Sequence, residues 1–217
     1  MNTTQTLSPL LVVPREYSQP LLHDGEPVVD LRLRWAEGGA DCPRRLARLL
    51  SRVPAVWQRY WEAVTVPLAA EVLAACRARS RPFTPWLCTL DTRVTQHSGC
   101  LLCVQWEAVL HRDGLPAVPV RHTLVWDLSA DAPRPLSSFL SRHFPRAAAL
   151  RAVAAQAPPG TDRLALWRRF SPRRFFLRGE EVVVFYPPGA LGPVEGSAEF
   201  PVGRLPEGVA EDALPSP

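Results

Sequence analysis

The feature that most constrains this chain is a long stretch of helical periodicity, residues 43–80, between segments that alternate like β-strands. Its apolar residues recur at intervals of three or four, which gives a helix one apolar face. Tryptophans lie on that face, so we expect the helix to pack on a sheet. Pro54 and Pro67 each remove a backbone hydrogen bond, which predicts one bent helix or two abutting ones. We expect Asp41 to be the N-cap, with Pro43 in the first turn.

Strand patterns lie on both sides of this helical stretch. Upstream, residues 10–13 and 28–35 are predicted strands, and the second alternates apolar with mostly charged side chains. That alternation is typical of a sheet with one face in water. Downstream, residues 85–96, 100–110 and 118–128 are three candidate strands in close succession. Their short connections predict an antiparallel meander.

The last third of the chain alternates between helical and extended patterns. Residues 136–143, 145–157 and 161–170 are predicted to be helical, and residues 175–186 a hairpin followed by a final strand at 197–202. The whole pattern predicts an α+β fold. In it, an antiparallel β-sheet meander packs against a long N-terminal helix and a second helical segment.

The size and composition are those of a globular protein. The chain has 217 residues, of which 47% are hydrophobic and 21% charged, enough for one well-buried domain. We expect an N-terminal arm (1–25), a single domain (26–204) and a disordered tail (205–217). Within the domain, two sub-lobes are expected at about 26–112 and 113–204.

The charge pattern narrows the class of partner and the compartment. All 25 basic residues are arginine and the formal net charge is +4, but the arginines are spread along the chain. We therefore expect no nucleic-acid partner, and the aromatic-interleaved face Arg163–Arg174 stays open as an alternative of that kind. No apolar stretch approaches the ~20 residues that span a bilayer. Residues 1–20 lack the features of a signal peptide, which predicts a cytoplasmic protein.

The cysteines give the only spacing that could suggest a metal or redox site. Cys100 and Cys103 are three residues apart in a predicted strand, where their side chains point to opposite faces. The five cysteines are an odd number, which argues against a disulfide framework. We expect reduced structural thiols, no metal and no cofactor. A zinc set completed by His97 and Cys88 is the alternative.

No catalytic motif is present in the sequence. There is no serine in a Gly-x-Ser-x-Gly elbow, no His-Glu-x-x-His pair and no phosphate-binding loop between a strand and a helix. His122 lies on an apolar strand face and is interpreted as a core histidine. The sequence therefore predicts that the protein is not an enzyme. A hydrolase with an unfamiliar site is the alternative, and it would need a pocket that joins a nucleophile to a base.

Three segments resemble a known family. Residues 126–140 contain WDL and PLSSFL, residues 175–193 read FFLRGEEVVVFYPPGALGP, and residues 199–202 read EFPV. These are similar to signatures of the C-terminal domain of RsiV-like anti-sigma factors, which bind lysozyme outside the cell. Related domains precede the catalytic part of some peptidoglycan deacetylases. The order of elements over residues 26–204 also matches that family.

The resemblance implies a non-catalytic, sensor-like binding domain that recognises a protein or a cell-wall glycan through its loops. The run 113–117 lacks the family's loop histidine, and Gly189 and Val194 stand near the places of its loop tyrosines. The implied function is therefore partner binding, without lysozyme as the named partner. The predicted partner-binding residues lie in and beside the loop 187–196: Tyr186, Pro187, Pro188, Gly189, Leu191 and Pro193.

Overall fold

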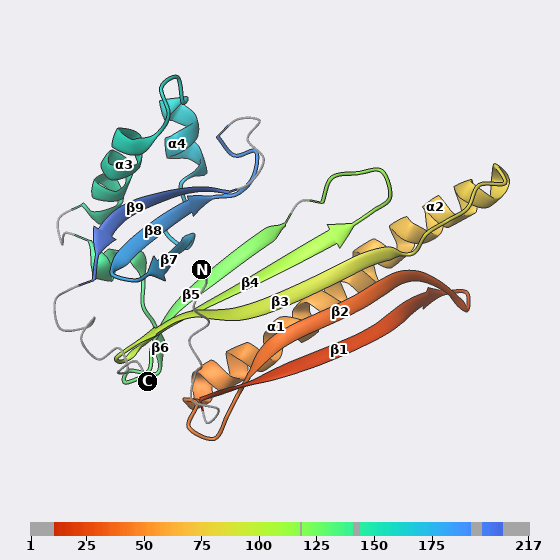
Figure 1. Cartoon of the computed structure of the whole chain (residues 1–217), viewed down its shortest axis with the longest axis horizontal. Coiled ribbons are helices and arrows are strands. Elements are labelled where there is room, and N and C mark those ends of the chain that lie inside the picture. The colour runs from red at the N-terminus through yellow and green to blue at the C-terminus, as the bar shows by residue number, and fades with distance from the viewer. Residues whose placement is uncertain (1–10, 118, 141–143, 192–196, 206–217) are drawn as a thin grey trace. The chain divides into compact units, whose positions relative to one another are not determined.

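The computed structural model of the chain describes residues 11–117, 119–140, 144–191 and 197–205. Its fold is α+β, which confirms the predicted class (Figure 1). The larger sheet has six strands in the spatial order of the sequence. They are β1 (Val12–His23), β2 (Glu26–Gly38), β3 (Trp86–Ser98), β4 (Leu101–His111), β5 (Val120–Asp127) and β6 (Ala132–Pro133).

The smaller sheet is a three-stranded antiparallel sheet made by the last part of the chain. Its first two strands are the predicted hairpin. Three short helical elements precede it. The elements are η2 (Leu136–Phe139), α3 (Pro145–Gln156), α4 (Arg163–Arg169), β7 (Phe175–Arg178), β8 (Glu181–Tyr186) and β9 (Ala198–Arg204).

Strand β1 is much longer than the predicted strand at 10–13, and it turns residues 12–23 of the expected N-terminal arm into part of the sheet. It forms an antiparallel hairpin with β2 through Asp24 and Gly25. Both turn residues have positive φ, 50° and 81°, as a two-residue hairpin loop requires. The prolines in this strand argue against a strand when only the sequence is considered, but a strand at the edge of a sheet tolerates them.

A long helix connects β2 to β3, and these two strands are parallel. The helix consists of α1 (Arg44–Tyr60), the π-helical turn η1 (Trp61–Thr65) and α2 (Val66–Ala78). A crossover helix is what a parallel pair of strands requires. The expected Asp41 cap is wrong: Pro43 is the N-cap residue and no side chain caps the helix.

The helix leaves α geometry at one place, which is not Pro54. Pro54 is buried inside α1, and the irregularity is the π-turn just before Pro67. There the N–H of Val66 donates to the carbonyl of Trp61, five residues back. Since Pro67 has no N–H, a wider turn at this point relieves the clash that its ring would cause. The predicted interruption therefore takes the form of one extra residue in a continuous helix.

Contacts divide the chain into two compact units, each with its own core. We call the described residues of 11–93 and 106–120 the helix unit, and those of 94–105 and 121–205 the hairpin unit. Strands β3 and β4 pass from one unit into the other. This division differs from the expected sub-lobes, because the segment 94–105 groups with the second half of the chain.

In the hairpin unit, helix α3 packs on β9, and Nε2 of Gln156 donates to the carbonyl of Pro201 at 2.6 Å. The predicted helix at 136–143 is only the short η2, and residues 141–143 lie outside the described residues. Leu205 is buried in the core. The predicted tail therefore starts no earlier than residue 206, and residues 206–217 are not described.

Candidate functional site

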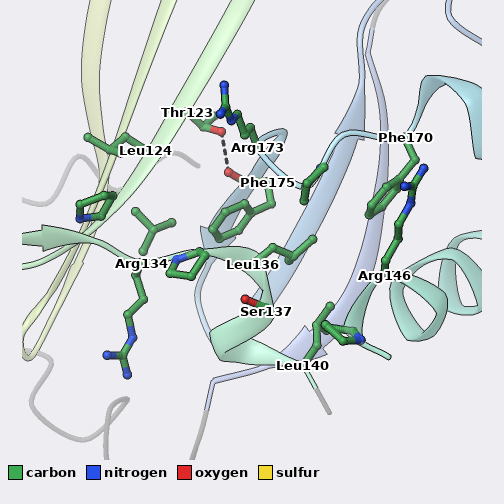
Figure 2. A pocket seen from close by; sticks show the side chains of 15 residues that line it. Thr123, Leu124, Arg134, Leu136, Ser137, Leu140, Arg146, Phe170, Arg173 and Phe175 are labelled. Carbon is green, nitrogen blue, oxygen red and sulfur yellow. Dashed lines mark hydrogen bonds between the residues drawn. The ribbon is translucent and has the colours of Figure 1, made fainter. Parts of the chain in front are cut away.

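The hairpin unit contains a cleft of about 630 Å³. Five segments between residues 123 and 175 contribute to it: β5, the turn after β6, η2, the start of α3, and the segment from Phe170 to Phe175 (Figure 2). Four prolines line its walls, which gives it rigid edges. They are Pro133, Pro135, Pro145 and Pro172.

The floor of the cleft is the core of the unit itself. Val125, Leu136, Phe170 and Phe175 line it, and each is 1–7% exposed. Phe175 also contacts the ring of Phe139, with 5.9 Å between centroids. An apolar ligand group placed here would contact side chains that packing already holds in place, which lowers the entropy cost of binding.

Arg134 lines one wall and is held by a carboxylate. Its Nη1 donates to Oδ2 of Asp127 at 3.1 Å, while Oδ1 of Asp127 accepts from the N–H groups of Ser129 and Ala130 at 3.0 Å. The Ala130 and Ser129 hydrogen bonds, together with the charge of Arg134, lower the pKa of Asp127. Asp127 is therefore ionised at neutral pH and neutralises Arg134.

Two further arginines line the cleft without an acidic partner among the residues that the structure describes. The guanidinium of Arg146 lies over the rings of Trp167 and Phe170, at 5.4 and 5.8 Å from their centroids. Stacking on aromatic faces leaves the N–H groups at the guanidinium edge able to donate. Arg173 has no ion pair with any residue that the structure describes. The described lining contains no Asp or Glu, so the cleft has a net positive charge.

The polar groups of the cleft are poorly suited to acid–base or nucleophilic chemistry. The hydroxyl of Thr123 donates to the carbonyl of Phe175 at 2.5 Å, and Ser137 is the other hydroxyl in the lining (Figure 2). No histidine, cysteine or carboxylate is among the described lining residues. Over the described chain as a whole, no group of three or more His, Cys, Asp or Glu is arranged to hold a metal ion.

The structure places the predicted partner-binding loop apart from this cleft, since none of its described residues is in the lining. Tyr186 is 1% exposed, and its hydroxyl donates to the carbonyl of Leu166 at 3.0 Å. Its side chain therefore supports the loop from the core. Pro187, Pro188 and Leu191 are half-buried and Gly189 is exposed. Pro193 lies outside the described residues, and the role of this loop stays a prediction.

The thiols that could have formed a metal or redox site do not share an environment. Cys100 is exposed in the turn before β4, whereas Cys103 and Cys88 are fully buried. Burial raises the pKa of Cys88 to about 12 and also raises the pKa of Cys103. Both buried thiols are therefore protonated and inert at neutral pH. The interpretation of His122 as a core histidine is wrong, because its side chain is exposed on β5. Partial desolvation, together with the charge of Arg174, lowers its pKa.

The segment Arg163–Arg174 is helix α4 with the turn that follows it. Trp167 is 54% exposed, and with Arg151 and Arg163 it lines a shallow hollow. Arg173 and Phe170, at the end of the segment, line the cleft instead. The segment therefore contributes to two surfaces and does not form one continuous basic face.

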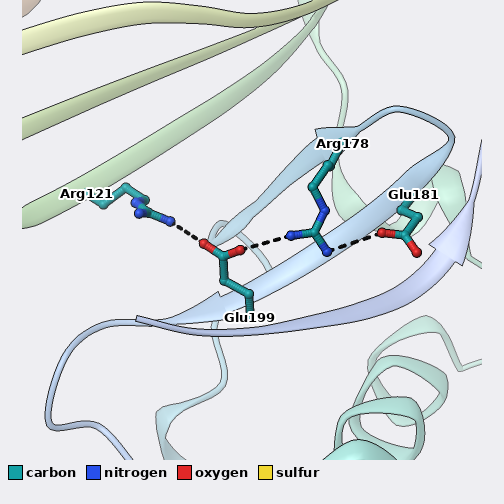
Figure 3. A network of polar contacts seen from close by, with 4 residues as sticks. All are labelled: Arg121, Arg178, Glu181 and Glu199. Atoms are coloured by element: carbon teal, nitrogen blue, oxygen red, sulfur yellow. Dashed lines mark hydrogen bonds and ion pairs between the residues drawn. The ribbon is translucent and has the colours of Figure 1, made fainter. Parts of the chain in front are cut away.

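A network of charges joins β5 to the small sheet within the hairpin unit. Glu199 accepts from Arg121 at 2.7 Å and from Arg178 at 3.2 Å, and Arg178 also donates to Glu181 at 3.2 Å (Figure 3). The guanidinium of Arg121 also lies over the ring of Phe185, 5.6 Å from its centroid. Phe175, at the start of β7, also accepts a hydrogen bond from Thr123 of β5. The charge network therefore adds to this contact in holding β5 against the small sheet, beside the cleft.

Sequence reasoning missed the cleft because its lining comes from segments between residues 123 and 175 that touch only after folding. One signal was present in the sequence. Six prolines fall within this span at the edges of predicted elements, and four of them line the cleft. These prolines indicated where helices and strands end. Which of those ends lie close together depends on the tertiary fold.

The fold defines a class of α+β domain in which a long helix covers a mostly antiparallel sheet and a second, helix-covered sheet follows. The sequence matches no protein-family model and no curated protein. Two crystal structures of DUF3298 family proteins are similar in fold. One, from Bacteroides fragilis NCTC 9343, has a TM-score of 0.60 and 11% identity, and the match covers 88% of each chain.

The other is a DUF3298 family protein from Pseudomonas aeruginosa PAO1, with a TM-score of 0.55 and 12% identity. That match covers 88% of this chain and 90% of the other. At such low identity the likeness extends to the fold. The RsiV-like relationship stays a prediction. In the described part of the chain, no helix has the length and apolar character to cross a membrane.

Proposed function

We propose that this protein is a non-catalytic binding module, and that the hairpin-unit cleft takes an apolar side chain and an adjacent carboxylate of a protein partner. The observation that carries the proposal is the composition of the cleft. Its floor is apolar core, and Arg146 and Arg173 lie in its walls without acidic partners in the described part of the chain. An apolar, acidic peptide segment is complementary to both properties, because guanidinium groups bind carboxylates in a two-pronged geometry.

The same composition favours a protein partner over a cell-wall glycan. Sugars present many hydroxyl groups and bind where carboxylates and amides can accept and donate hydrogen bonds. The described lining has two hydroxyls and three arginines and is otherwise apolar. Pockets of about 300–1,000 Å³ are of the size that holds a small ligand or a side-chain cluster.

A display selection on the folded protein tests this proposal. A random peptide library is selected on the wild type, and the enriched peptides are then measured against Arg146→Glu and Arg173→Glu. Arg168→Glu is the matched control, because Arg168 is exposed on α4 and is not in the lining. We expect enrichment of an apolar residue beside Asp or Glu. Each cleft variant should weaken binding by about tenfold or more, as loss of one charge-assisted contact predicts.

The same experiment also tests the predicted loop as the alternative binding site. A variant in which residues 187–191 are replaced by a Gly/Ser sequence leaves the cleft residues unchanged. Peptides that lose affinity for this variant, and keep it for both arginine variants, would place recognition in the loop and contradict the cleft. Enrichment of basic peptides would contradict the charge argument.

A further inference from the structure

The long helix of the helix unit has a second apolar row that its own sheet does not cover. Buried or half-buried side chains occur at every fourth position: Trp57, Trp61, Thr65, Ala69 and Leu73. An exposed apolar row precedes each of them by one residue and is 40–54% exposed: Val56, Tyr60, Val64, Leu68 and Val72. A helix that is apolar on so much of its circumference is normally covered on both faces.

The π-turn keeps this outer row straight. In a regular α-helix a four-residue spacing drifts around the axis by about 40° per step, so five positions would spread over almost half of the circumference. The extra residue in η1 (Trp61–Thr65) takes back about 100° of that drift. The positions before and after the turn therefore stay in one line. The same turn aligns the buried row on the sheet.

The outer row borders a groove of about 480 Å³. Its other wall is the end of β4 and the start of β5, with Ala108, Leu110 and Val120. No charged residue is among the described lining residues. Val120 is 45% exposed. The groove therefore fits a neutral apolar element lying beside the helix.

The pattern of the row indicates which element covers it. Its residues are symmetric about Val64, with Tyr60 and Leu68 on either side and a valine at each end. A two-fold axis at Val64 would pair Tyr60 of one chain with Leu68 of the other and would place Val64 against itself. A surface that matches itself in this way is what an isologous dimer interface requires.

The charges beside the row have the same symmetry. Arg59 and Glu71 lie twelve residues apart, centred next to Val64. With the extra residue of the π-turn, they are separated by about three full turns and so lie on the same flank of the row. In an antiparallel helix pair, equal flanks face each other, so Arg59 of each chain would meet Glu71 of the other. Within the described residues, Arg59 donates a hydrogen bond to the carbonyl of Ala55 and has no ion pair, and Glu71 has no ion pair either.

We infer that this face is an interface between two copies of the chain, with the two long helices antiparallel about Val64. The apolar row provides the buried area. The Arg59–Glu71 pairs fix the antiparallel direction, because a parallel pairing would leave these charges without partners. The proposal is independent of what the hairpin-unit cleft binds.

Sedimentation velocity over a wide range of protein concentration tests the proposal. We expect the wild type to dimerise. Val64→Arg should raise the dissociation constant by about a hundredfold or more, because two like charges would meet at the axis. The matched control is Leu22→Arg, since Leu22 is 55% exposed on β1 and is not in the groove. It should dimerise like the wild type, and far-UV circular dichroism checks that both variants are folded.

Charge reversal tests the direction of pairing on exposed residues that do not affect folding. Arg59→Glu and Glu71→Arg should each weaken the dimer by about tenfold, since two rim pairs become repulsive. The double variant R59E/E71R should return to near the wild-type dissociation constant. A wild type that is monomeric at every concentration would mean that another partner covers the face, and would overturn the proposal. A dimer that Val64→Arg leaves intact, or a double variant without recovery, would also overturn it.

Discussion

The cleft of the hairpin unit and the groove of the helix unit are both apolar, but they are built in opposite ways. The cleft in the hairpin unit has a floor of core residues such as Phe175 and Val125, and arginines in its walls. The groove in the helix unit is bordered by a row of surface residues on one helix, with a positive and a negative charge beside it. The excess positive charge of the cleft favours a partner that carries negative charge. The balanced charges beside the symmetric row of the groove favour a second copy of the same chain. The charges around each hollow therefore indicate its partner better than its apolar lining does.

The largest expected effect is on stability, and it distinguishes a core residue in the cleft floor from a surface residue in the groove wall. Phe175→Ala should lower the free energy of unfolding by about 3–5 kcal/mol, because it removes a buried aromatic ring. Leu68→Ala, on the half-exposed row, should cost less than about 1 kcal/mol in the monomer. Urea unfolding at low protein concentration measures both, so that dimerisation does not add to the stability. Equal losses would show that the outer row belongs to the core after all.

Removal of the π-turn is the next largest change. Deletion of Ala63, which is exposed in η1, would convert the turn to α-helix and rotate α2 by about 100°. Leu73 and Ala69 would then leave the sheet, and we expect a loss of about 2–3 kcal/mol in the free energy of unfolding. Ala74→Gly is the control, because it disturbs α2 without rotating it and should cost about 1 kcal/mol. A deletion variant as stable as the wild type would show that alignment by the π-turn is unimportant.

The contribution of the Asp127 carboxylate to stability depends on pH. Asp127→Asn should cost about 1–2 kcal/mol at pH 7, because the ion pair with Arg134 is lost. The pKa of Asp127 is lowered in the folded protein. Its contribution is therefore complete above the unfolded pKa of about 3.9 and disappears as the pH falls through the lower, folded pKa.

Urea titrations from pH 7 to acid, run on the wild type and on this variant, measure that contribution as a difference. The two stabilities should converge below about pH 4. Ser138→Ala is a useful control, since Ser138 is exposed and does not contribute to the pKa of Asp127, and it should keep the wild-type pH dependence. A constant difference down to the most acidic condition would contradict the role of the carboxylate charge.

Periodicity in the sequence was enough to predict the α+β class, the long helix and the hairpin β7–β8, because these depend on local alternation. It failed where the outcome depends on contacts between distant segments. Prolines in β1 are tolerated only because that strand is at an edge, and the parallel pairing of β2 with β3 cannot be read from either strand alone. The cleft was missed for the same reason. The sequence also did not separate the exposed row at Val56 and Tyr60 from the buried row beside it, because apolar spacing does not show how wide a face the sheet covers.

The smallest expected effect concerns the ion pairs of the two units. A double-mutant cycle with Arg121→Gln and Glu199→Gln should give a coupling energy of about 0.5–1 kcal/mol, because these side chains are only 22% and 29% exposed. The cycle for Arg15 and Glu37 in the helix unit, 56% and 42% exposed, should give less than about 0.5 kcal/mol. High salt should reduce the second coupling more than the first, since screening acts mainly on exposed charges. Equal couplings would mean that the Arg121–Glu199 network does not hold β5 against the small sheet, and that packing around Phe175 alone shapes the cleft.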